Sequence, residues 1–260
     1  MRSNIRRKYN LSKRGGCLAI NWHRRTTAHR ALTNPVLVIT RWRIEKEDVE
    51  RLEQLKHIKL TILVTWSGID DDRIEPVDSN IAKASLRTLS AHATRTKKIL
   101  YWRPLIASLN DTDHHITQAH ELSNHADATV FTGLFYRNEI RSYFRKLGVQ
   151  DLYDETTRRK ILPRQTEQRV LSAFTDRPLF RKTSCGVAFV HGIADYNGHF
   201  GIHEICSICP ASQLALCASN HRRPDQGRVR ELALAAKLDP EPILIDDRRV
   251  EGTSNNSVAD

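Results

Sequence analysis

Four of the five cysteines in this chain of 260 residues lie close together near its C-terminal end. They form the spacing C-x20-C-x2-C-x7-C and are Cys185, Cys206, Cys209 and Cys217. Thiolates are soft ligands that suit zinc and iron–sulfur clusters, and a C-x2-C pair can offer two sulfurs from one turn. Cytosolic thiols stay reduced, so disulfides are not expected. We therefore expect one metal centre here, with a [4Fe–4S] cluster favoured over zinc; scattered structural thiols are the alternative.

The stretch between Cys185 and Cys206 is rich in glycine and histidine. Glycine and asparagine supply the backbone angles of turns, so a loop or hairpin is expected. Four cysteines already complete a tetrahedral site or a cluster, which leaves the histidines behind the ligands or at the surface. The residues concerned are His191, Gly192, Asp195, Tyr196, Asn197, Gly198, His199, Gly201 and His203.

The net charge of +11 is concentrated at the start of the chain. Residues 1–44 hold eleven of the 41 basic residues and no acidic one, which leaves the remainder balanced at 30 of each sign. A basic protein often binds a polyanion, but here the charge describes a tail rather than a binding face. The tail could be a disordered arm, an organelle-targeting segment or a non-native start.

The elements that must position the cysteines alternate between apolar and amphipathic stretches. Continuous apolar strands followed by amphipathic helices indicate βα units and a parallel sheet. We expect strands at Pro35–Thr40, Ile58–Thr65, Lys98–Trp102 and Ala128–Thr132, and helices at Lys46–Lys56, Ser79–Ala93, about 112–124 and Arg137–Lys146. The fold class is therefore α/β, a partial (βα) barrel with a small cysteine-rich segment.

Reactive groups in such sheets gather at the carboxyl ends of the strands. That rule selects Thr40–Arg41, Thr65–Gly68, Arg103–Asn110 and Gly133–Arg137. Arg103 is expected directly after the third strand, as a ligand-binding residue or as part of a salt bridge. Gly133 is expected where a backbone must approach closely, or at a helix-entry turn. Glu75 reads as a loop anchor. Residues 158–164 read as a solvated basic helix end, with a phosphate site as the less favoured alternative.

Four passages resemble the later part of a radical S-adenosylmethionine protein. They are PVLVITRWRIEKEDVERLEQL, LVTWSGIDDDRIEP, LYWRPLIASLNDTDHHITQAHELSNHADATVFTGLFYR and FRKTSCGVAFVHGIADYNGHFGIHEICSICPASQ. The RPL-x4-ND motif is similar to the fifth βα unit of that barrel, and GLFYR to the end of the sixth strand. The resemblance implies that Arg103, Asn110 and Gly133 help to hold S-adenosylmethionine. It also implies that the four cysteines form an auxiliary iron–sulfur segment.

The chain departs from that family at its start. Radical S-adenosylmethionine enzymes hold their catalytic cluster with C-x3-C-x2-C after the first strand, whereas the only upstream cysteine here is Cys17. We expect a truncated protein that does not cleave the cofactor alone, and a separate polypeptide could supply the missing strands. The expected divisions are a basic tail (1–34), a βα domain (35–178), the four-cysteine segment (179–220) and a C-terminal extension (221–260).

Two functions remain open from the sequence. One is a radical S-adenosylmethionine-like iron–sulfur protein with an unknown substrate and unknown catalytic residues. The other is a zinc-binding module whose basic arm contacts nucleic acid, although the neutral body makes nucleic acid a less favoured partner. No apolar run reaches the 18 residues of a membrane span, so a cytoplasmic protein is expected. In the extension, we expect a helix at Gln226–Lys237 and a strand at Pro242–Val250.

Overall fold

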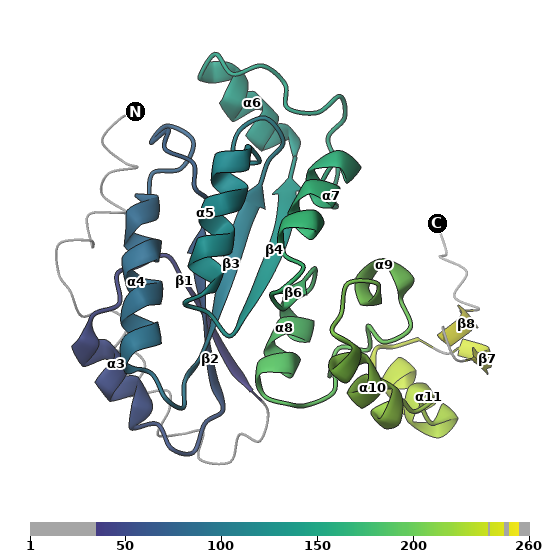
Figure 1. Ribbon diagram of the computed structural model, residues 1–260. Coiled ribbons are helices and arrows are strands. Elements are labelled where there is room, and N and C mark those ends of the chain that lie inside the picture. The colour runs from purple at the N-terminus through teal and green to yellow at the C-terminus, as the bar shows by residue number, and fades with distance from the viewer. Residues whose placement is uncertain (1–34, 239, 247–249, 255–260) are drawn as a thin grey trace.

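A computed structural model describes residues 35–238, 240–246 and 250–254 (Figure 1). The basic tail and Cys17 lie outside the described residues. The chain folds as an α/β protein whose mostly parallel sheet has five parallel strands and curls into a half-barrel. The expected α/β class and parallel partial barrel are thus confirmed.

The sheet follows chain order. Strands β1 (Val36–Thr40), β2 (Leu60–Trp66), β3 (Lys97–Leu105) and β4 (Ala128–Phe135) pair in parallel with their neighbours. On the far edge of β4, β6 (Leu179–Phe180) adds a fifth parallel strand, and β5 (Lys160–Ile161) pairs antiparallel. Among the strands that the structure describes, β1 pairs only with β2 and therefore forms one edge of the sheet.

Two of these strands differ from the sequence-based expectation. The two-residue strand β6 is too short to show an apolar run. Residues 158–164 were expected to form a basic helix end, which is wrong, because they contain β5 instead. Its backbone is drawn into the sheet by pairing with Leu134 and Phe135 of β4.

One face of the sheet is covered by α3 (Lys46–Glu53), α4 (Ser79–His92), α5 (Asp113–Ser123) and α7 (Arg164–Ala173), while α6 (Asn138–Lys146) lies beyond the carboxyl ends of the strands. Helices α3, α4, α5 and α6 lie where amphipathic spacing predicted them. Asp78 and Thr112 begin α4 and α5 by accepting hydrogen bonds from the backbone N–H groups of Asn80 and His115.

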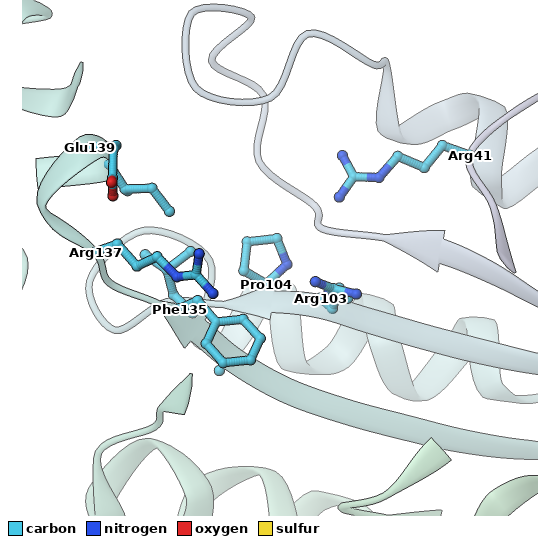
Figure 2. A pocket seen from close by; sticks show the side chains of 9 residues that line it. Arg41, Arg103, Pro104, Phe135, Arg137 and Glu139 are labelled. Atoms are coloured by element: carbon cyan, nitrogen blue, oxygen red, sulfur yellow. The ribbon is translucent and has the colours of Figure 1, made fainter. Parts of the chain in front are cut away.

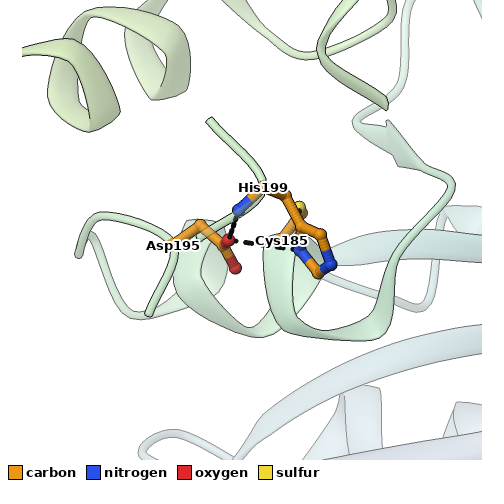
Figure 3. Close-up of side chains that lie close together, drawn as sticks. All are labelled: Cys185, Asp195 and His199. Carbon is orange, nitrogen blue, oxygen red and sulfur yellow. Dashed lines mark hydrogen bonds and ion pairs between the residues drawn. The ribbon is translucent and has the colours of Figure 1, made fainter. Parts of the chain in front are cut away.

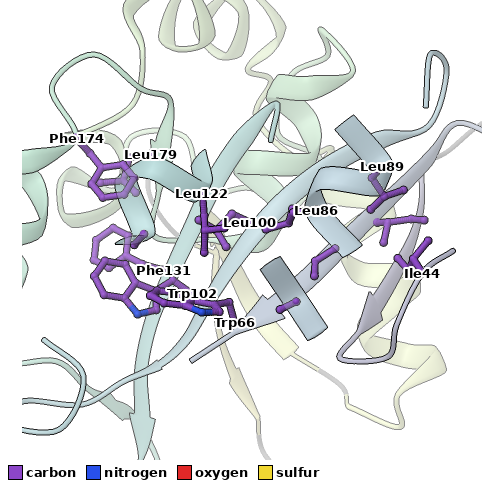
Figure 4. Packing of buried hydrophobic residues seen from close by; sticks show 14 of the residues in the cluster. Ile44, Trp66, Leu86, Leu89, Leu100, Trp102, Leu122, Phe131, Phe174 and Leu179 are labelled. Atoms are coloured by element: carbon purple, nitrogen blue, oxygen red, sulfur yellow. The ribbon is translucent and has the colours of Figure 1, made fainter. Parts of the chain in front are cut away.

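The core on this face is apolar and aromatic (Figure 4). The rings of Trp66 and Trp102 lie 5.8 Å apart, and the ring of Phe174, directly after α7, lies 6.4 Å from that of Trp102. Both tryptophans are buried because alternate residues of β2 and β3 point to the same face. This packing fixes the strands whose ends form the cavity described below.

The opposite face of the sheet is covered by α8 (Thr183–Val190). Its Gly186 allows close approach, because an added Cβ would lie 2.8 Å from Cγ2 of Val130. Cys185 is buried in the same layer, next to Val130 and Phe180. Both β6 and α8 therefore join the sheet, although they lie inside the 179–220 range expected for the cysteine segment.

The rest of the chain forms short elements beside the half-barrel (Figure 1). They are α9 (His203–Cys206), α10 (Ala211–Asn220), α11 (Gln226–Ala235), β7 (Pro240–Ile245) and β8 (Val250–Ser254). The expected single strand at Pro242–Val250 is wrong, since β7 and β8 pair as an antiparallel hairpin. Among the described helices, none has the length and apolarity to cross a bilayer.

Candidate metal centre and strand-end cavity

The four cysteines come from three helices and one turn. Cys185 lies in α8 on the sheet, and Cys206 is the last residue of α9. Cys209 follows in the turn before α10, and Cys217 lies within α10. Cys185 and Cys217 are buried and the other two are partly buried; all four are free thiols.

The glycine-rich stretch begins as helix and continues as a loop. Helix α8 extends to Val190, and residues 191–202 then carry glycines with positive φ at Gly192, Gly198 and Gly201. The loop part of the expectation fits residues 191–202. The first residues of the stretch are helical because Val187 and Ala188 of α8 pack their apolar side chains against the sheet.

Asp195 and His199 of this loop lie next to Cys185 (Figure 3). One ligand atom from each of the three residues lies within 4.8 Å of the others. Sγ of Cys185 is 3.8 Å from Nδ1 of His199, and Nδ1 is 3.2 Å from Oδ2 of Asp195. The backbone N–H of His199 donates to the same Oδ2 at 2.9 Å, which closes the turn.

The same turn reaches two further sulfurs. The backbone N–H of Asp195 donates to Sγ of Cys217 at 3.3 Å, and Nε2 of Gln213 donates to that sulfur at 3.3 Å. The thiol of Cys206 donates to the carbonyl of His199 at 3.5 Å. Residues 195–199 thus contact three of the four cysteines.

The thiols lie close enough for their charges to act on one another. Burial, followed by the negative charges of Asp195 and Cys209, raises the pKa of Cys185 to about 12. Burial, followed by the charges of Cys206 and Cys217, raises the pKa of Cys209 to about 11. Four thiolates would repel one another here, and a bound cation would remove that repulsion.

Asp195 supplies an independent sign that the site suits a cation. Its side chain is only 3% exposed, and its Oδ1 has no hydrogen-bond partner among the described residues. A buried, unpaired carboxylate oxygen is costly unless an ion or a water satisfies it. The donor set of thiols, carboxylate and imidazole therefore fits a thiophilic metal or a cluster. Sequence reasoning placed His199 away from the metal and assigned Asp195 no role, although their i, i+4 spacing between the cysteines was visible.

No protein-family model matches this chain, and a search of curated proteins finds no relative.

A second candidate site lies at the carboxyl ends of β1, β3 and β4 (Figure 2). The cavity has a volume of about 520 Å³. Three of the four strand ends selected from the sequence meet here. The lining residues are Arg41, Arg103, Pro104, Gly133, Leu134, Phe135, Arg137, Glu139 and Ile140.

Arg103 lies within β3 rather than after it. The strand continues past a change of register and pairs Leu105 with Gly133, so Arg103 remains on the sheet. Its guanidinium carbon is 5.3 Å from the centre of the Tyr101 ring, and Nη1 donates to the Tyr101 hydroxyl at 3.4 Å. The side chain is held over the sheet and reaches the cavity.

Gly133 lacks a side chain for a structural reason. A Cβ at this position would lie 1.8 Å from the carbonyl oxygen of Ile161. The expected close backbone approach is therefore the crossing of β5, and the glycine places β5 beside the cavity.

Asn110 does not line the cavity. It is fully buried, and its Oδ1 accepts the backbone N–H of Ile106 at 2.7 Å. Its Nδ2 donates to the carbonyls of Ser67 at 2.6 Å and Pro104 at 2.7 Å. These bonds occupy the amide, so Asn110 shapes the ends of β2 and β3 instead of presenting a polar group to a ligand.

Arg41 enters the cavity from the end of β1. Its Nη1 forms an ion pair with the buried carboxylate of Glu75, which fixes the loop after β2. Glu75 therefore acts as a loop anchor and orients Arg41.

Proposed function

We propose that this chain is an iron–sulfur protein built on a half-barrel of the radical S-adenosylmethionine kind. Cys185, Cys206, Cys209 and Cys217 are its cluster ligands. The observation that carries the proposal is the turn at residues 195–199, which contacts three of the four cysteines in a partly buried site. The fourth, Cys209, acts on Cys185 through its charge.

A cluster with four protein thiolates transfers electrons or stabilises structure when bound. In this chain, the N–H groups of Asp195 and Gln213 aim at the sulfur of Cys217. Hydrogen bonds to ligand sulfurs tune reduction potential, so these two donors are suited to that task. The α8 helix holds Cys185 against the sheet and couples the centre to the half-barrel.

Binding of S-adenosylmethionine is a further part of the proposal. Arg103 and Gly133 line the strand-end cavity, and Asn110 supports it from behind. Reductive cleavage by this chain alone is not expected, because it has no C-x3-C-x2-C motif. Incubation with dithionite and the cofactor should give no 5′-deoxyadenosine above background. A separate polypeptide that supplied the motif would restore the product.

A zinc site is the second candidate, and one observation favours it. Cys185, Asp195 and His199 bring sulfur, oxygen and nitrogen atoms within 4.8 Å of one another. Zinc accepts such mixed ligands in tetrahedral sites. In that case the chain would be a zinc module, and nucleic acid would be a candidate partner for its basic arm.

Anaerobic purification with iron, sulfide and zinc analysis separates the two candidates. For a cluster, we expect visible absorption, and we expect iron to fall in each of the four Cys→Ser variants. His199→Gln and Cys17→Ser should keep the iron. If the protein is colourless and contains zinc, and His199→Gln and Asp195→Asn lose that zinc, the site binds zinc and the cluster assignment is wrong. Loss of metal in Cys17→Ser but not in Cys217→Ser would overturn the ligand assignment.

A further inference from the structure

The strand-end cavity is strongly positive. Arg41, Arg103 and Arg137 direct their guanidinium groups toward the space around Pro104 (Figure 2). Lys160 of β5 approaches from the side, with its Nζ 5.5 Å from the centre of the Phe135 ring. Glu139 is the one acidic residue in the lining.

Three of these four cations have no carboxylate partner in the surrounding described protein. Arg41 has Glu75 as its partner. Among the residues that the structure describes, no carboxylate lies within ion-pair distance of Arg103, Arg137 or Lys160. Arg103 and Arg137 instead rest on aromatic rings, with the guanidinium carbon of Arg137 5.6 Å from the ring centre of Phe135. Uncompensated cations at one concave site raise the local concentration of anions.

Two hydroxyl groups at the base of this region are placed among the cations. Tyr101 is almost fully buried; burial alone would raise its pKa, but Thr183 and the charges of Lys160 and Arg103 outweigh burial and lower it. Thr132 of β4 is buried, and its hydroxyl also acts to lower the pKa of Tyr101.

The lining also has an apolar part and a helix start. Pro104, Leu134, Phe135 and Ile140 give the cavity walls for a hydrocarbon or an aromatic ring. The first turn of α6 faces the same space, and its N-cap Arg137 offers no side-chain acceptor to the helix N–H groups. A helix N-terminus adds partial positive charge to the guanidinium groups around it.

We propose that this cavity binds a small organic anion, in which a phosphate or carboxylate group is attached to an apolar body. Arginine recognises both oxyanions with paired N–H donors, and the volume of about 520 Å³ suits a small organic molecule rather than a bare ion. The proposal goes beyond the cluster and does not depend on it. S-adenosylmethionine, proposed above for the same cavity, has one carboxylate against its sulfonium and ammonium groups. The two ligands should therefore compete, and the cavity should bind the anion more tightly than that cofactor.

Calorimetric titration of the purified, metal-loaded chain at low salt tests the proposal. The probes are phenyl phosphate, phthalate, benzyl alcohol and S-adenosylmethionine. We expect both anions to bind, benzyl alcohol not to bind, and the cofactor to bind more weakly than the better anion. Stronger binding of phenyl phosphate identifies phosphate as the preferred group, and stronger binding of phthalate identifies carboxylate.

Charge-removing variants locate the binding. Arg103→Gln and Lys160→Gln should each weaken anion binding by about tenfold or more, since each removes a charge-assisted contact. Arg87→Gln removes an exposed charge on α4 and should leave the affinity unchanged. Circular dichroism and metal content verify folding, and the exposed Arg137→Gln replaces Arg103→Gln if the latter unfolds.

Equal binding of benzyl alcohol and anions, or full affinity in the folded cavity variants, would overturn the proposal. A purified chain that holds no metal but still binds the anions would contradict the proposed cluster and leave the anion site standing.

Discussion

The half-barrel of residues 35–190 buries an extensive apolar core, whereas the cysteine segment of residues 191–220 buries almost nothing. Within the segment, only Gln213 and Cys217 are buried. The half-barrel encloses Trp66, Trp102 and Phe131 between sheet and helices. Apolar burial can stabilise the first region alone. The second region has too little of it, and a bound metal centre can replace the missing core.

Metal removal should produce the largest difference between the two regions. After anaerobic chelation, we expect amide hydrogen exchange in residues 191–220 to rise by about 100-fold or more, because the metal supplies most of the local stability. Amides of β2 and β3 should remain protected. Exchange measured by mass spectrometry reports both regions in one sample. A similar rise in β3 would show that the half-barrel also depends on the metal.

The core of the half-barrel should be sensitive to a single truncation. Trp102→Ala removes a fully buried ring and should lower the free energy of unfolding by about 3–5 kcal/mol. Trp42→Ala is the matched control, since Trp42 is 44% exposed, and it should change stability by no more than about 0.5 kcal/mol. Urea unfolding followed by circular dichroism measures both. Equal losses in the two variants would remove the distinction between buried and exposed rings.

Gly133→Ala should disturb the edge of the half-barrel rather than its core. The added methyl group would overlap the carbonyl of Ile161, so β5 must move, at a cost of about 1–3 kcal/mol. Because β5 carries Lys160, anion binding in the cavity should weaken as well. Gly148→Ala has open space around the new methyl group and should leave anion binding unchanged. It controls for binding alone, since its φ of +74° means that any side chain there strains the backbone. Unaltered stability and binding in Gly133→Ala would show that β5 does not need the glycine.

Glu53 should give the smallest and most pH-dependent effect. Burial alone would raise its pKa, but hydrogen bonds from Thr94, Thr96 and Arg95 lower it from 4.5 to about 2. The ionised carboxylate is thus favoured in the folded state, so its contribution is complete above pH 4.5 and is lost as pH falls toward 2.

Glu53→Gln should lower the free energy of unfolding by about 1–2 kcal/mol at pH 7, and by less at pH 3. Urea unfolding at pH 7, 4 and 3 measures this convergence. Glu50, which forms an exposed ion pair with Lys46, provides the control. Glu50→Gln should change the free energy of unfolding little at any pH. If the free energies of unfolding of Glu53→Gln and wild type differed by the same amount across the pH range, the hydrogen bonds to the Glu53 carboxylate would not explain its stabilising effect.

Sequence reasoning located the half-barrel more completely than the candidate sites. The first four strands and their helices carry long periodic signals, which predicted both type and order. Strands β5 and β6 have two residues each, and their positions depend on pairing with β4 rather than on local pattern. No window of sequence contains that information.

The sites were predictable where residue type alone carries chemistry. The cysteine spacing selected the residues of the candidate metal centre, and the strand-end rule selected most of the cavity. The burial of Asn110 and the position of Asp195 depend on how distant loops close, and spacing does not report this. Lys160 lies in the basic stretch 158–164, where a phosphate site was the less favoured interpretation, and it comes beside Phe135 of the cavity only because β5 pairs with β4.

The placement of Cys185 on the sheet implies an order in which the proposed metal ligands are positioned as the chain is made. Its helix packs on strands that leave the ribosome earlier, so the half-barrel can fix this first sulfur while the chain that carries the others is still emerging. At typical rates of synthesis, the stretch from Cys185 to Cys217 takes about 2–6 seconds to be made. During that interval the nascent chain offers a positioned but incomplete set of ligands. A chain that binds the proposed metal centre would therefore need its metal late in synthesis, and a shortage would leave a folded half-barrel with an unfinished end.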